Sequence, residues 1–165
     1  AADKMTLVFE PGVALANLPD KTYYGNYDSV SWGYAFRGSL EYADAFAREY
    51  QDKAPLIYST ISPDAVASSR ADVDFAAASG AIEGLMAKLA LRARARGVSR
   101  LVVAGGETSG AVIEALRPGA MTVGPDVAPG VPLLSAGRIG FALKSGNFGD
   151  EDFFEKALRM MEETP

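Results

Sequence analysis

Two stretches of the sequence combine glycines with residues that can bind an anion. The first is AGGETSG, residues 104–110, which follows the apolar run RLVV. The second is LKSGNFGDEDFF, residues 143–154, in which a lysine precedes a loop of small residues and a run of acids. Stretches of this kind can hold a phosphate, contact a metal ion or simply turn the chain.

The first stretch has the order strand, glycine turn, helix. Gly105 and Gly106 can adopt positive φ and let a ligand approach the backbone, because they carry no Cβ. The free N–H groups of the helix start would then face an anion. Thr108 or Ser109 can cap this helix through a hydroxyl, or contact a phosphate or hydrated metal instead. Neither the P-loop ending nor the dinucleotide-binding glycine spacing is present, so a plain turn remains an equal alternative on local grounds.

The second stretch follows a strand that ends at Lys144, whose ammonium could meet a phosphate. The loop after it consists of small residues that can wrap an anion, namely Ser145, Gly146, Asn147 and Gly149. The acids at 150–152 would occupy the first turn of the last helix and repel a phosphate unless Mg²⁺ intervened. We therefore expect the anion over residues 144–147, with the acids capping the helix or touching a metal through water.

Composition excludes several classes of function. The chain has 165 residues, a formal net charge of -5, and neither cysteine nor histidine. A disulfide, a thiolate nucleophile, a Cys/His zinc site and an imidazole base are therefore excluded. The charge argues against nucleic acid as a partner, and we interpret the basic cluster at 92–100 as a solvated helix end. No apolar run reaches membrane-spanning length and no signal peptide is evident, so we expect no membrane partner and a cytoplasmic location.

Short apolar runs alternate with helical patterns, which predicts one α/β domain with three layers: a mixed, mostly parallel sheet with helices on both faces. The predicted strands cover residues 6–10, 56–59, 100–104, 121–123, 131–134 and 139–144. The predicted helices cover about 39–50, 76–96, 108–116 and 150–162. The aromatic segment 18–38 shows no clean period, and its role stays open between loop packing and stacking on a ligand ring. If both glycine stretches lie at one edge of the sheet, they form the two lips of one crevice.

The motifs GGETSG and KSGNFG, in this order and spacing, resemble the nucleotide-binding domain of the four-carbon acid sugar kinases. The resemblance continues more loosely through LIYSTISPDAVAS and VFEPGVALA, and covers roughly two thirds of the chain. These kinases phosphorylate tetronate-type sugar acids, among them 3-oxo-tetronate, D-threonate and D-erythronate, with ATP. The resemblance implies carbohydrate metabolism, with ATP and Mg²⁺ as cofactors.

The resemblance also assigns roles to residues. It implies an ATP site shared by the loop at Gly105, Gly106, Glu107 and Thr108 and the loop at 146–149. Glu107 would contact a metal or the ribose, Ser109 would offer donors, and the catalytic residue stays unknown. Family members bind the sugar acid through a separate N-terminal domain with an Asp-Asp-x-Thr-Gly signature, which these residues lack. Residues 1–165 are then the nucleotide-binding domain alone, inactive without the substrate-binding domain.

Two other classes of function remain open. The chain could be a non-catalytic module that binds a phosphorylated metabolite through the same loops. It could instead be a protein-interaction domain that uses the region 23–36. Apolar surface that another domain would cover could also make the chain a homodimer.

Overall fold

The computed structural model describes residues 4–8, 24–26, 35–49, 54–58, 75–145 and 148–163. These residues contain seven strands: β1 (Lys4–Val8), β2 (Tyr24–Asn26), β3 (Leu56–Tyr58), β4 (Arg100–Ala104), β5 (Thr122–Ala128), β6 (Val131–Ala136) and β7 (Ile139–Lys144). They also contain four helices: α1 (Ala35–Glu49), α3 (Phe75–Ala95), α4 (Gly106–Leu116) and α5 (Phe153–Glu163).

The strands form one sheet in the order β2-β3-β1-β4-β7-β6-β5. The first five of these are parallel to their neighbours, whereas β6 is antiparallel to β7 and β5 is antiparallel to β6. Two short turns at 129–130 and 137–138 join the antiparallel strands. The sheet is therefore mixed and mostly parallel, as the sequence predicts.

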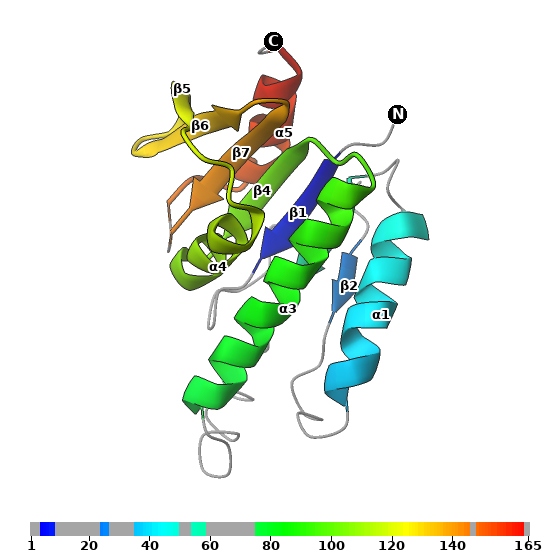
Figure 1. The fold of residues 1–165 in the computed structure, drawn as a ribbon. Coiled ribbons are helices and arrows are strands. Elements are labelled where there is room, and N and C mark those ends of the chain that lie inside the picture. Colours follow the sequence, from blue (N-terminus) through cyan, green and yellow to red (C-terminus); the bar gives the residue numbers. More distant parts are fainter. Residues whose placement is uncertain are drawn as a thin grey trace.

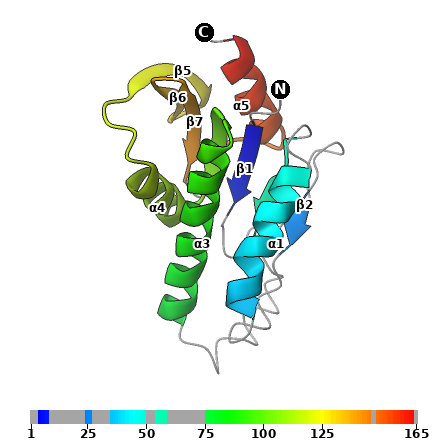
Figure 2. The ribbon, with the colours of Figure 1, turned by 45° about the vertical axis from the view of Figure 1, so that its right-hand side comes forward.

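Helices cover both faces of the sheet (Figure 1), which confirms the predicted three-layer α/β fold. The helices α1, α3 and α4 lie on one face, and α5 lies on the other, behind β4 and β7 in this view. The turned view in Figure 2 keeps α1 and α3 side by side. Among the described residues, no helix combines the length and the apolar character needed to cross a membrane.

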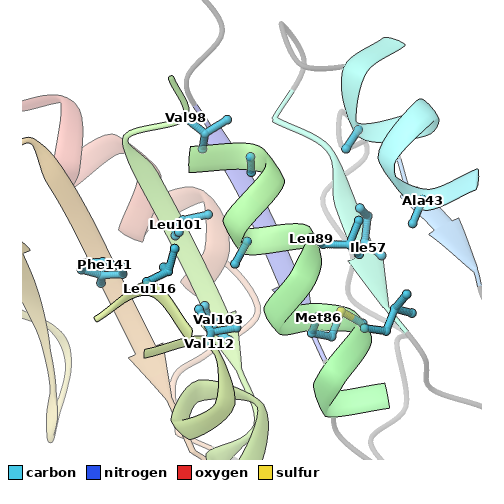
Figure 3. Packing of buried hydrophobic residues seen from close by; sticks show 14 of the residues in the cluster. Ala43, Ile57, Met86, Leu89, Val98, Leu101, Val103, Val112, Leu116 and Phe141 are labelled. Carbon is cyan, nitrogen blue, oxygen red and sulfur yellow. The ribbon is translucent and has the colours of Figure 1, made fainter. Parts of the chain in front are cut away.

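Strand β4 shows why a strand at the centre of the sheet has a continuous apolar sequence. Leu101 and Val103 face the cluster under α1, α3 and α4, whereas Val102 faces the cluster under α5. All three are fully buried, because a central parallel strand is covered on both sides. The first of these clusters is drawn in Figure 3.

Helix α3 contributes an apolar stripe to that first cluster. Its buried residues recur at spacings of three and four, as predicted: Ile82, Leu85, Met86, Leu89 and Ala93. Gly97 ends the helix with φ +91°, and its N–H donates to the carbonyl of Arg94 while the N–H of Val98 donates to that of Ala93. These two bonds are the pattern of a Schellman motif, which needs a left-handed residue at this place.

The arginines near the end of α3 are partly or fully exposed, and they are also paired with other elements, which the interpretation as a solvated helix end does not include. Arg92 donates to both carboxylate oxygens of Glu41, at 3.0 and 3.1 Å. Arg96 forms an ion pair with Asp44. These interactions join α3 to α1, the two neighbouring helices on this face of the sheet.

Several element boundaries differ from the expected ones. Helix α1 begins at Ala35, four residues early, and β5 runs on to Ala128 instead of ending at Val123. Strand β2 lies inside the aromatic segment and is missed by the sequence prediction. The rest of that segment, up to residue 34, lies outside the described residues.

Candidate functional site

The glycine turn after β4 leads directly into α4. Gly105 has φ +107°, a conformation that favours glycine, and it precedes the helix without any side-chain capping bond. The helix begins at Gly106, so Thr108 and Ser109 lie inside its first turn and neither is the expected cap. The first turn closes with the N–H of Ser109 donating to the carbonyl of Gly105 at 2.9 Å. The three N–H groups before it have no acceptor within the helix.

The two glycine stretches lie at one edge of the sheet. Ala104 and Lys144 are partners at the carboxyl ends of the neighbouring parallel strands β4 and β7. The N–H of Gly105 donates to the carbonyl of Lys144 at 2.9 Å. A Cβ built on Gly106 would lie 3.2 Å from Oγ of Ser145. The start of α4 and the loop after β7 are therefore in contact, which is the arrangement that the sequence analysis required for a shared crevice.

Two polar side chains are buried at this edge. Among the residues whose burial is described, Thr108 and Lys144 are the buried polar or charged ones, with exposed fractions of 0% and 9%. Thr108 shares its helix face with the buried Val112 and Leu116. Its Oγ1 has no hydrogen-bond partner within the described part of the chain. A buried hydroxyl without a partner is costly, so a polar group supplied by a ligand would stabilise it.

The other candidate residues divide by exposure. Gly106, Glu107, Ser145 and Gly149 are exposed, so their polar groups are open to a ligand. Ser109 is half-buried, and its hydroxyl lies 3.5 Å from the carbonyl of Val103, which makes a long and weak contact. The last two candidates, residues 146 and 147, lie outside the described residues.

Gly149 has a structural reason to be glycine. Its φ is +89°, and a Cβ added to it would lie 2.5 Å from Cδ2 of Phe153. Phe153 is buried at the start of α5, so the ring cannot move away easily. Gly149 thus lets the loop pass tightly over the first residue of the last helix.

The acids at 150–152 were expected to occupy the first turn of the last helix. They lie before α5 instead. The helix begins at Phe153, and the N–H of Lys156 donates to the carbonyl of Asp152 at 2.9 Å. A hydrogen bond between the side chains of Asp150 and Asp152 lowers the pKa of Asp150 and raises the pKa of Asp152. Three or more acidic side chains grouped as for a metal ion do not occur within the described residues.

The sequence analysis missed two features of this edge, a turn between β5 and β6 and an exposed phenylalanine. The turn at Pro129–Gly130 lies beside the loop after β7, because β6 runs antiparallel to β7 with Leu133 opposite Ala142. A Cβ on Gly130 would lie 3.6 Å from Cε1 of Phe148, whose side chain is 52% exposed. The Pro-Gly pair between two apolar runs is a turn signal that could have revealed this neighbour.

A groove of about 650 Å³ lies at the opposite edge of the sheet. Its lining includes Arg100 and Ile139, which are the first residues of β4 and β7, together with Arg138 and Glu162. The guanidinium of Arg100 forms an ion pair with Glu162 at 2.9 Å. None of the ten candidate residues lines this groove, so the molecule offers two separate places where a ligand could be sought.

Comparison with known proteins identifies the fold and the family. Residues 35–154 match the sequence model of a family described as the nucleotide-binding C-terminal domain. A 3-oxo-tetronate kinase of Burkholderia multivorans is 44% identical over 126 residues, which is 74% of this chain and 29% of the kinase. The 3-oxo-tetronate kinase of Methylobacterium radiotolerans is 50% identical over 122 residues, 71% of this chain and 29% of the kinase. The chain thus spans less than a third of the length of these curated relatives.

Solved structures agree with the sequence relatives. A Haemophilus influenzae protein of the DUF1537 family matches with a TM-score of 0.82 and 33% identity, over 95% of this chain and 40% of that one. A Bordetella bronchiseptica domain of unknown function matches with a TM-score of 0.68 over 98% of this chain and 42% of that one. It is 20% identical, which shows the shared fold alone, and it was solved with citrate as a domain-swapped dimer.

Proposed function

Because the chain belongs to the family of nucleotide-binding C-terminal domains, we propose that it is the ATP-binding domain of a kinase that phosphorylates four-carbon sugar acids. The 3-oxo-tetronate kinases among its relatives support the reaction class. Their greater length supports a second domain that carries the sugar-acid site. The carboxylate that would accept the proton of the sugar hydroxyl belongs to that second domain in this proposal.

The contact between Gly106 and Ser145 is the observation that carries the ATP site. It brings the N–H groups of the α4 start, which have no acceptor within the helix, to the small-residue loop after β7, at the carboxyl edge where open α/β sheets bind ligands. Gly106 leaves room that a Cβ would occupy, and Thr108 offers a buried hydroxyl without a partner among the described residues. An oxygen-rich anion such as a triphosphate fits both features.

The roles of the individual residues follow from their positions. Gly105 and Gly106 let the backbone approach the phosphates, and the N–H groups of the first turn donate to them. Lys144 is largely buried at the end of β7, and its positive charge would favour an anion at this edge of the sheet. Ser145 and the exposed Glu107 line the mouth, with Glu107 facing the metal or the ribose.

Mg²⁺ fits this site as a companion of the nucleotide. It usually keeps several waters and binds through one or two carboxylates together with substrate phosphates. Glu107 and Asp150 are exposed carboxylates beside the two loops and could contact it through water. When bound, Mg²⁺ neutralises the charge that develops on the transferred phosphoryl group.

Titration calorimetry with ATP and Mg²⁺, followed by a kinase assay with tetronates, tests the proposal. We expect this chain to bind the nucleotide weakly and to show no turnover of sugar acid, because it supplies positioning and charge but no base for the acceptor hydroxyl. Adding the substrate-binding domain of a relative should restore turnover. Absence of any ATP binding would refute the ATP site, and turnover by this chain alone would refute the division of labour.

A thermal-shift panel separates the proposal from the two other classes of function. A larger shift with sugar phosphates than with ATP would favour a metabolite-binding module. No shift with any small ligand would favour a protein-interaction domain.

A further inference from the structure

Phe148 is exposed beside the proposed phosphate site. Three large apolar side chains are exposed among the residues whose burial is described, and Phe148 is the aromatic one, with 52% of its surface in contact with solvent. A phenylalanine left half in water forgoes a large part of the stabilisation that burial would give. Its position therefore calls for a reason other than packing within this fold.

The backbone of Phe148 has a constraint on each side. Its N–H donates to the carbonyl of Ser145 at 3.4 Å. The following residue, Gly149, is held by its positive φ and by the close ring of Phe153. Phe148 therefore lies next to Ser145, whose side chain is close to Gly106.

One side of the Phe148 ring packs against the turn between β5 and β6. Its Cε1 lies 3.6 Å from where a Cβ of Gly130 would be, and Gly130 has φ +78°. Pro129, the other residue of this turn, is exposed. The turn thus supports the ring while part of it remains open to solvent.

We propose that Phe148, supported by the Pro129–Gly130 turn, is the platform on which the purine base of the nucleotide stacks. This inference rests on the proposed ATP site and adds the place of the base. A triphosphate bound over the contact between Gly106 and Ser145 would carry its nucleoside away from the N–H groups of α4. Phe148, whose N–H donates to Ser145, has the exposed aromatic ring next to that contact. Aromatic rings bind bases through their faces, and such stacking needs no hydrogen-bonding groups.

The affinities of the chain for ATP and for inorganic tripolyphosphate, each with Mg²⁺, separate base binding from phosphate binding. Phe148→Ala should weaken ATP binding about tenfold, within the range that base–aromatic stacking contributes, and should leave the affinity for tripolyphosphate unchanged. Phe148→Tyr should keep the affinity for ATP, because it retains the ring face. Val123→Ala is the matched control, since Val123 is 68% exposed and lies on the edge strand β5.

The same affinities can also contradict the inference. Equal losses for ATP and tripolyphosphate in Phe148→Ala would mean that the ring only shapes the loop. Unchanged ATP affinity would mean that the base lies elsewhere, although the phosphate site would stand. If the unaltered chain binds neither probe, the proposed ATP site fails and the platform fails with it.

Discussion

The backbone N–H of Gly105 donates a hydrogen bond of 2.9 Å to the carbonyl oxygen of Lys144. This bond continues the parallel pairing of β4 and β7 by one residue beyond Ala104. It holds the start of α4 against the loop after β7, although about forty residues separate them in the sequence. The hydrogen bonding of the sheet thus brings the two proposed anion-binding ends together.

Gly106→Val should abolish nucleotide binding and leave the fold intact. Even the Cβ alone would lie 3.2 Å from Oγ of Ser145, and the two methyl groups would fill the space above the helix N–H groups. Titration with ATP gives the affinity, and far-UV circular dichroism checks the fold.

Gly110→Ala is the control for Gly106→Val. It lies in the same helix, is exposed, and its added Cβ meets nothing within 4 Å. Alanine favours the helix interior by about 0.5–1 kcal/mol over glycine, so this variant should be slightly more stable and bind ATP normally. Unchanged affinity in Gly106→Val would place the phosphates elsewhere.

Thr108→Val should weaken ATP binding without loss of stability. The substitution keeps the shape and removes a buried hydroxyl that has no partner among the described residues. The free energy of unfolding in urea should stay level or rise by up to about 1–2 kcal/mol.

Thr108→Ser gives the opposite pattern. It keeps the hydroxyl and deletes a buried methyl group, so it should lose about 1 kcal/mol of stability and retain binding. A Thr108→Val variant that is destabilised and binds ATP normally would show that the hydroxyl serves the fold.

Gly149→Ala should destabilise the protein by about 2 kcal/mol or more, because a positive φ and a clash act together. The added Cβ would lie 2.5 Å from the buried ring of Phe153. Gly119→Ala isolates the first effect, since Gly119 has φ +76° and nothing within 4 Å of an added Cβ. Its cost should be about 1 kcal/mol. If urea unfolding shows the same loss of stability for Gly149→Ala and Gly119→Ala, the ring of Phe153 moves aside without strain.

Glu41→Gln should make the free energy of unfolding less dependent on pH in the acid range. The hydrogen bond from Arg92 lowers the pKa of Glu41 below its usual value. A carboxylate with a lowered pKa in the folded state stabilises the fold above its unfolded pKa, and this contribution disappears as the pH falls through the folded pKa. Between about pH 5 and pH 3 the variant should therefore lose less stability than the unaltered chain. The difference should be small and should shrink in salt, because both groups face solvent.

Identical pH profiles for the Glu41→Gln variant and the unaltered chain would mean that the ion pair of Glu41 with Arg92 contributes nothing in solution. Far-UV circular dichroism during urea unfolding at each pH gives both profiles.

The interior of the sheet was predictable because burial on both faces leaves a clear sequence pattern. The bounds of β4 and β7 and the core face of α3 were predicted correctly from apolar runs and helical spacing. The glycine turn before α4 was also recognised. The contact between this turn and the loop after β7 could not be predicted, because it depends on the order of the strands in the sheet.

The edges of the sheet were harder to predict. In β5, residues 122–126 are exposed, so no alternation of apolar and polar residues marks the strand. Gly124 and Pro125 within it argue against a strand, but an edge strand with an irregular register tolerates both. Strand β2 has only three residues and lies in an aromatic segment without a period.

The sequence indicates the two glycine stretches as candidates for the site, but not the environment of each side chain. Eight of the ten candidate residues fall within the described part of the chain. Thr108 was expected to cap the helix, but the helix begins two residues earlier, and the Thr108 hydroxyl is buried without a partner among the described residues. The exposed ring of Phe148 lies against the β5–β6 turn, and this contact depends on the pairing of β6 with β7, which the local sequence around Phe148 does not give.

The most direct test of the phosphate site is an NMR titration of the backbone amides with a non-hydrolysable ATP analogue and Mg²⁺. The amide signals of Gly105, Gly106 and Ser145 should shift together and saturate at one ligand concentration. Saturable shifts confined to Gly137 and Gly140, which line the groove at the opposite edge, would contradict the proposed site.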